Sequence, residues 1–218
     1  MTKPKPGPKP KQWPNRLALV RDLAKYPWRR HIEPSDVALV VRQSVGANTF
    51  RAFQRLPNKP SVVFREWGAG ALETRGFLDR LRGVRSRDSY DQWLAGLVSD
   101  FREEWKREMG KAIPFGPSLK LPNLLVKALL ESRLLPDSVR ERIVWFLHVP
   151  LDSYTIQAVT NCPDTSGDQI RKILNSATMR FVENQAVYDS LQKRIRSLAD
   201  EAAVPPIALD YLAWNASH

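Results

Sequence analysis

Cysteine and histidine are scarce in this chain of 218 residues. Cys162 is the only cysteine, which excludes an intrachain disulfide and a cysteine-based zinc or iron–sulfur site. The three histidines, His31, His148 and His218, lack the spacing of metal ligands, so we expect no metal. A chain without disulfides is typical of the cytoplasm, and we expect a cytoplasmic protein.

Long apolar runs and glycine-rich loops are also missing. No stretch approaches the ~18 apolar residues of a membrane span, and the N-terminus lacks the apolar segment of a signal peptide. We therefore expect no membrane association. No internal repeat and no glycine-rich phosphate loop occurs, which argues against a nucleotide-dependent enzyme, and we expect no cofactor.

Positive charge is plentiful. Lysine and arginine number 34 against 23 aspartates and glutamates, and 34 − 23 gives a net charge of +11. Such an excess attracts polyanions before any specific contact forms. It could serve solubility alone, but in a chain of mixed apolar content it indicates a nucleic acid partner.

The first residues form a lysine- and proline-rich tail. We expect residues 1–14 to be disordered, because prolines remove hydrogen-bond donors and lysines repel one another. The tail could be an arm that touches phosphates or a solubilising leader. The length of the remainder, residues 15–218, suits one domain or two small lobes around a shared core.

Apolar side chains recur every three or four residues along most of the chain, which predicts an all-α fold. One segment, residues 61–64, is β-branched and is open to two interpretations, a short strand or a helix that starts after Pro60. The expected helices cover residues 15–23, 37–43, 90–105, 121–130, 136–147, 150–159, 186–202 and 207–214.

A single polar stripe runs along the expected helix that begins near Lys120. At ~100° per residue, Lys120, Asn123, Lys127 and Glu131 share one side, and the rest of the circumference is mostly apolar. Such a stripe is usually just a solvated face. We place Lys120 in the first turn, with Pro122, where the helix dipole and partial burial both disfavour the ammonium form. A neutral amine is a nucleophile.

The segment before this helix, residues 113–118, has the composition of a tight turn. Amide groups around a glycine turn that leads into a helix can hold one phosphate, so Gly116 and Ser118 are candidate phosphate-binding residues.

Asp152 follows Pro150 and Leu151 and precedes Ser153, a pattern typical of a helix N-cap. A capping carboxylate is also rigidly aimed, which suits stabilisation of a cationic sugar in a transition state. The two roles can coexist.

Residues 119–127 and 149–152 resemble the catalytic-lysine helix and the Pro-x-Asp turn of helix-hairpin-helix DNA glycosylases. The separation of Lys120 and Asp152, 152 − 120 = 32 residues, is most similar to the archaeal-type 8-oxoguanine DNA glycosylase branch. Residues 188–193, 204–206 and 209–214 also resemble that branch. Of the family's Leu-Pro-Gly-x-Gly hairpin only Gly116 is kept, and residues 1–109 match poorly.

This resemblance implies a two-lobed all-α fold, with a divergent lobe at 15–109 and a hairpin and catalytic lobe at 110–218. Double-stranded DNA that contains a modified base would bind at the lobe junction, with the base flipped out, to a monomeric enzyme. Lys120 would expel the base and form a Schiff base, whose β-elimination nicks the strand. Asp152 would help to deprotonate Lys120 and stabilise positive charge.

The resemblance places Trp214 in the base pocket, and a core tryptophan is the structural alternative. Gln43 and Trp93 are pocket candidates from the divergent lobe, and each has the same structural alternative. Oxidised guanine is the family's usual base. A hypermodified phage base is the other candidate, and it would make this an antiphage defence enzyme.

Two other classes of function remain open. One is a non-catalytic helical DNA-binding protein on the same scaffold. The other is a protein–protein adaptor whose basic face meets an acidic partner.

Overall fold

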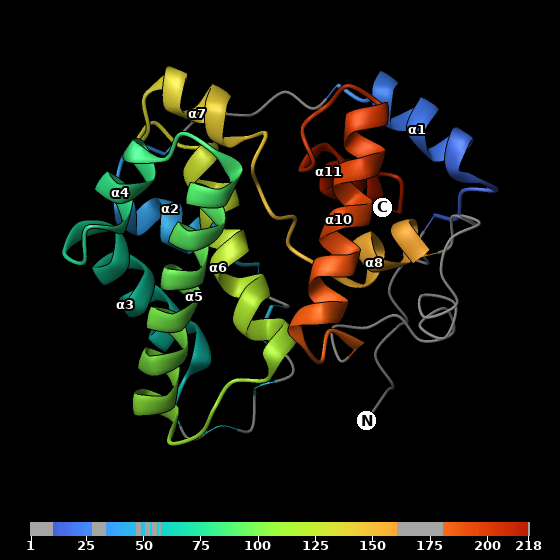
Figure 1. Ribbon diagram of the computed structural model, residues 1–218. Helices are drawn as coiled ribbons and strands as arrows, with labels where there is room; N and C mark the ends of the chain where they lie inside the picture. The colour runs from blue at the N-terminus through green and yellow to red at the C-terminus, as the bar shows by residue number, and fades with distance from the viewer. Residues whose placement is uncertain are drawn as a thin grey trace. The chain divides into compact units, whose positions relative to one another are not determined.

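The computed structural model describes residues 11–27, 34–46, 49–50, 53, 56, 58–160 and 181–217. These residues form helices and no strand, which confirms the predicted all-α fold (Figure 1). Residues 61–64 lie in a helix, so the strand interpretation is wrong. The helices are α1 Arg16–Lys25, α2 Val37–Gln43, α3 Pro60–Glu73, α4 Phe77–Gly83, α5 Arg87–Met109, α6 Phe115–Leu130, α7 Asp137–Ile143, α8 Ser153–Thr160, α10 Gln185–Glu201 and α11 Ala208–Asn215.

The chain divides into two compact units. The central unit is Arg29–Pro150, and the terminal unit combines Met1–Trp28 with Leu151–His218. The expected lobe boundary between residues 109 and 110 falls inside the central unit, because α6 packs on α5. Among the residues that the structure describes, no helix is long and apolar enough to cross a membrane.

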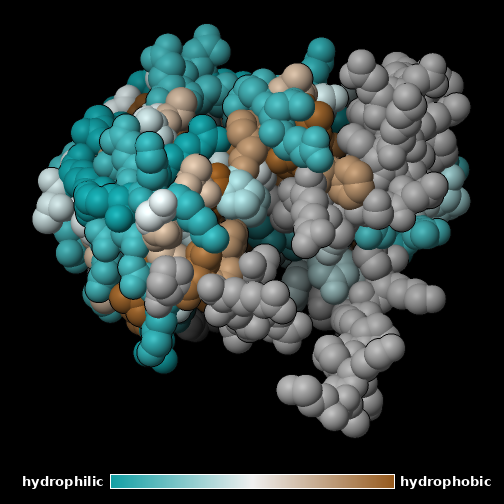
Figure 2. Space-filling model, turned by 90° about the horizontal axis from the view of Figure 1, so that it is seen from below, coloured by the Kyte–Doolittle hydropathy of each residue, from teal (hydrophilic) through white to brown (hydrophobic). Residues whose placement is uncertain are grey.

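The core of the central unit is aromatic. Phe64 and Trp67 of α3 meet Phe101 and Trp105 of α5, and the Trp67 and Phe101 rings have centroids 4.5 Å apart. All four side chains are buried. Figure 2 shows hydrophilic residues over much of the visible face, with smaller hydrophobic areas between them.

α5 is the longest described helix, and strong signals mark both of its ends. Ser86 caps its start in a reciprocal capping box with Ser89, and Gly110 ends it with φ +67°, a conformation that favours glycine. α3 and α2 approach closely at Gly68 of α3, where an added Cβ would lie only 2.9 Å from the Val41 side chain of α2.

An ion-pair network joins the connection between α3 and α4 to α5 through Arg75. Its guanidinium donates to Asp100 and Glu104, each at 2.7 Å, and Asp100 also accepts from the Trp67 indole at 2.8 Å. The two carboxylates raise the pKa of Arg75 although burial opposes that rise. The Glu104 side chain is only 9% exposed, so it depends on its arginine partners.

We predict that Arg75→Met lowers the free energy of unfolding by about 2 kcal/mol, because it leaves Asp100 without its arginine and the buried Glu104 with Arg107 as its remaining described ion-pair partner. Urea denaturation measures this change. Arg65→Met is the matched control, since the exposed Arg65 side chain bonds, within the described residues, only the Ser61 carbonyl of its own helix, and it should change stability by less than about 0.5 kcal/mol. Equal effects of the two substitutions would contradict the prediction.

The terminal unit is built on α10, which packs with α1, α8 and α11. Of the apolar positions that the spacing predicts, Leu191, Ile195, Leu198 and Ala202 are buried, whereas Val187 is half-buried and its neighbour Tyr188 is buried instead. Asn184 caps the start of α10, and its side chain accepts from the Val187 amide. The predicted last helix is α11.

The end of the predicted disordered tail is ordered by α1. Trp13 is 3% exposed and its indole donates to Asp22 at 3.0 Å, while the Lys11 amine lies 3.1 Å from the same oxygen. Trp13, which lies within the segment predicted to be disordered, is thus buried against α1. The first ten residues lie outside the described part of the chain.

These contacts make the stability of the protein depend on pH. Hydrogen bonds from Trp13 and then Lys11 hold the pKa of Asp22 below its usual value of 3.8. A carboxyl with a lowered folded-state pKa stabilises the fold above its unfolded-state value, and this contribution is lost as the pH falls through the folded-state pKa.

We predict that Asp22→Asn flattens the fall in stability below about pH 4. The urea midpoint, measured from about pH 6 to pH 2.5, tests this expectation. Asp200→Asn on the exposed side of α10 is the control and should keep the wild-type profile. An unchanged profile for Asp22→Asn would show that the contacts carry no pH dependence.

Candidate functional site

The predicted site residues fall in both units. The central unit holds Lys120, Gly116, Ser118, Gln43 and Trp93, whereas the terminal unit holds Asp152 and Trp214. Asp152 is the second residue after the boundary between Pro150 and Leu151.

The helix that carries Lys120 begins earlier than predicted. α6 starts at Phe115 with Pro114 as its N-cap, so Lys120 is the sixth residue and lies in the second turn. The placement of Lys120 in the first turn is therefore wrong, and the helix dipole is weaker at its position. Pro122 likewise lies inside the helix, where it cannot donate to the Ser118 carbonyl.

The polar stripe of α6 is present, with one correction. Lys120, Leu124, Lys127 and Glu131 are half-buried at spacings of four, three and four residues. Asn123 is 1% exposed and bonds the Leu119 carbonyl at 2.9 Å, so it belongs to the buried side.

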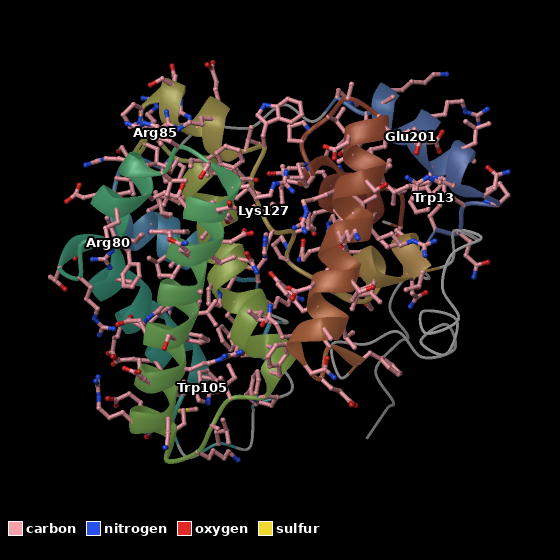
Figure 3. All side chains as sticks on the ribbon, viewed as in Figure 1. Trp13, Arg80, Arg85, Trp105, Lys127 and Glu201 are labelled. Atoms are coloured by element: carbon pink, nitrogen blue, oxygen red, sulfur yellow. The ribbon has the colours of Figure 1, made fainter. Side chains whose placement is uncertain are left out.

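The Lys120 amine has no hydrogen bond and no ion pair with any residue that the structure describes. Lys127, the other lysine of the stripe, lies on the same helix (Figure 3).

The predicted tight turn before α6 is wrong, because Phe115–Ser118 forms the first turn of the helix. Gly116 is buried within that turn. The Ser118 hydroxyl is fully buried, donates to the Phe115 carbonyl at 2.6 Å and accepts from Arg102 at 2.9 Å. This oxygen is engaged inside the central unit and not presented to a phosphate.

Arg102 of α5 is a cation at this helix start that the sequence did not reveal. Its guanidinium lies 5.1 Å from the centre of the Phe115 ring and has no carboxylate partner in the described part of the chain. Burial lowers the pKa of Arg102, but a guanidinium stays charged. The helix start therefore combines free amide groups with an uncompensated positive charge, which favours anions. No spacing in the sequence links residues 102 and 118, since tertiary packing brings them together.

The two pocket candidates of the central unit have different environments. Trp93 is buried, donates its indole N–H to the Phe77 carbonyl at 2.9 Å and packs between Phe77 and Tyr90, as a core tryptophan does. It also lines an open cleft of 460 Å³. Gln43 is exposed at the C-terminal end of α2.

Asp152 is the N-cap of α8, as predicted. Its Oδ1 accepts from the Tyr154 and Thr155 amides, both at 2.9 Å, and the Thr155 hydroxyl lies 3.2 Å away. The hydroxyl also lies 3.3 Å from Oδ1 of buried Asp210 on α11, and with one hydrogen it donates to one carboxylate at a time. None of these bonds uses Oδ2 of Asp152.

Trp214 belongs to the same region of the terminal unit. Its side chain is 49% exposed, so the core-tryptophan alternative is wrong. The ring meets Tyr154 edge to face, with centroids 5.4 Å apart, and Tyr154 is two residues from Asp152. α8 and α11 thus bring together a carboxylate, the half-buried Tyr154 and the exposed Trp214.

Comparisons of the chain with protein-family models, with curated proteins and with solved structures found no match. Within the described ranges, no group of three or more His, Cys, Asp or Glu could hold a metal ion. Cys162, His31 and His218 lie outside those ranges.

The geometry of the cap predicts that substitutions of Asp152 can separate the effect of its charge from the effect of its capping hydrogen bonds. Asparagine caps as well as aspartate, so Asp152→Asn should change the free energy of unfolding by less than about 0.5 kcal/mol, while Asp152→Ala should lower it by about 1 kcal/mol. Urea denaturation compares the two, and Asn184→Ala at the start of α10 provides the reference loss of a cap. Equal destabilisation by Asn and Ala would refute the capping role.

Proposed function

We propose that this protein is a DNA glycosylase that flips out and excises a damaged or modified base and then acts as an AP lyase through Lys120. The observation that carries the proposal is the state of the Lys120 amine, which lacks a partner in the described structure. Within the other unit, the cap fixes one oxygen of Asp152, while the other oxygen takes part in none of its described bonds. The resemblance to helix-hairpin-helix glycosylases supplies the chemistry that these two residues would perform.

In this reaction the neutral amine of Lys120 attacks C1′ of the flipped nucleotide. The C1′–N bond breaks, the base leaves with the electron pair and takes up a proton, and the amine gives its proton to Asp152. Opening of the sugar ring yields a Schiff base. Loss of a C2′ proton then breaks the C3′–O bond and nicks the strand.

The exposed Trp214 ring suits recognition of the flipped base. Enzymes that flip bases hold them between aromatic side chains, and Trp214 lies against Tyr154 close to the catalytic carboxylate. Oxidised guanine and a hypermodified phage base are the two substrates that we propose, for repair and for antiphage defence respectively.

Charge supports a DNA partner. The chain carries a net charge of +11, and Arg102 places an uncompensated cation at the start of the lysine helix. We expect the protein to act as a monomer on double-stranded DNA in the cytoplasm.

Borohydride trapping tests the proposal, because it reduces the Schiff base to a stable covalent adduct. The substrates are duplexes with 8-oxoguanine and DNA extracted from phages whose bases are hypermodified. We predict that Lys120→Gln lowers adduct formation by at least about 100-fold. Asp152→Asn should slow base release by at least about 10-fold with little change in DNA affinity.

Lys127→Gln is the matched control, since it removes the other lysine of the same stripe, and it should keep the adduct. Undiminished trapping by Lys120→Gln would exclude this nucleophile, and loss of the adduct in Lys127→Gln alone would assign the reaction to Lys127. Salt-dependent DNA binding without any adduct or base release would support the non-catalytic alternative.

A further inference from the structure

Arginines gather at one end of the central unit, where α4, α5 and α7 meet. Arg80 and Arg82 belong to α4, Arg85 and Arg87 flank the cap of α5, and Arg142 belongs to α7. Figure 3 shows Arg80 beside α4 and Arg85 beside α7. Each of these side chains is exposed or half-buried.

Two of these guanidinium groups share the same backbone acceptors. Arg142 donates to the Val84 carbonyl at 2.8 Å and to the Arg82 carbonyl at 3.1 Å. Arg85 donates to the same two oxygens, at 3.1 Å and 2.6 Å. Two positive charges are therefore held side by side by carbonyl groups, which orient them but do not neutralise them.

Few ion pairs form in this arginine cluster. In the described part of the chain only Arg82 has an acidic partner, the exposed Asp79, while Arg87 donates to the Trp145 carbonyl and Arg80 lies over the Phe77 ring. Among the residues that the structure describes, Arg80, Arg85, Arg87 and Arg142 have no ion pair.

The proximity of these two positive charges is unfavourable in the free protein. Burial and the charge of Arg85 both lower the pKa of Arg142, so the two groups repel each other. Like charges that the fold holds together in this way are stabilised by an anion between them. The contrast is Arg75 in the same unit, whose guanidinium has two carboxylate partners.

We propose that the arginine cluster binds the phosphate backbone of duplex DNA. A guanidinium fork matches the oxygens of a phosphate, and carbonyl bonds on one edge fix it in advance, which lowers the entropy cost of binding. Beside the cluster lies the open cleft of 460 Å³, lined by Arg80, Gly83, Val84 and Ser89, where a backbone can approach closely.

The cluster is separate from the proposed nucleophile. The Arg82 guanidinium reaches the Leu134 carbonyl, beyond the C-terminal end of α6, whereas Lys120 lies in the second turn of that helix. At 1.5 Å per residue, Lys120 and the end of α6 at Leu130 are about 15 Å apart. The choice of DNA as the nucleic acid rests on the proposed function. The inference that the cluster binds phosphate groups is independent of that function.

Fluorescence anisotropy with an unmodified, labelled DNA duplex tests the inference over a series of salt concentrations. Arg85→Gln should lower the affinity about 5-fold, Arg80→Gln/Arg85→Gln should lower it further, and the slope of log affinity against log salt should fall by about 1 for each arginine removed. Arg65→Gln is the control, because it removes an exposed arginine that also bonds a carbonyl of its own unit, and it should keep at least half of the wild-type affinity.

Stability separates binding from a structural role. Arg142 still serves both carbonyls in Arg85→Gln, so the urea midpoint of this variant should equal or exceed that of the wild type. An affinity loss no larger than that of Arg65→Gln would overturn the inference. So would an Arg85-dependent loss of binding to anionic phosphatidylserine vesicles with duplex binding unchanged.

The failure of this inference is distinguishable from the failure of the proposed function. If Lys120→Gln still traps or no adduct forms, while Arg85→Gln weakens duplex binding, the cluster is a phosphate-binding surface on a different kind of protein. Equal affinity and equal Arg85 dependence for duplex RNA of the same sequence would overturn the choice of DNA. If the adduct forms and Arg85→Gln leaves the duplex affinity unchanged, the proposed glycosylase function stands and the inference that the arginine cluster binds DNA fails.

Discussion

The candidate site depends on the burial of α6 by its neighbouring helices. α2 and α5 pack against this helix, and most of its residues are buried. Within this helix Phe115, Pro117, Lys120, Leu124 and Lys127 are half-exposed, so its two ionisable side chains, Lys120 and Lys127, lie on the accessible part. A proline within the helix and a hydroxyl bonded to Arg102 are tolerated because surrounding packing holds the helix in place.

The positively charged side chains of the central unit have two different kinds of partner. Where cations serve the fold, they meet carboxylates, as Arg75 meets Asp100 and Glu104. Arg85 and Arg142 instead meet carbonyl oxygens, and Arg102 meets a hydroxyl and a ring. A protein that binds a polyanion gains from this division, because positive charge that the fold leaves uncompensated is neutralised by the ligand.

Sequence patterns predicted the features of this structure that depend on residues close together in the chain. The apolar spacing of α10 and the cap at Asp152 depend on residues a few positions apart, and the structure has both. The start of α6 was missed because Pro114, Gly116 and Pro117 suggest a turn. Prolines are nevertheless tolerated in a first turn, where amides lack intrahelical partners.

Other features could not be predicted because they join distant segments. Trp13 is buried against Asp22, Arg102 bonds Ser118, and Thr155 reaches Asp210. The same holds for the two arginines that share the carbonyls of residues 82 and 84, since one comes from α7. The sequence shows only that cations are abundant, and their compensation is a property of the packing.

Our proposal has the Lys120 amine form the bond to the DNA sugar. Mass spectrometry of peptides from the borohydride-reduced protein–DNA adduct identifies the modified residue without any substitution. We expect the mass of the reduced sugar remnant on Lys120, in the peptide from α6. A remnant on Lys127, on another lysine or on the N-terminal amine would contradict it.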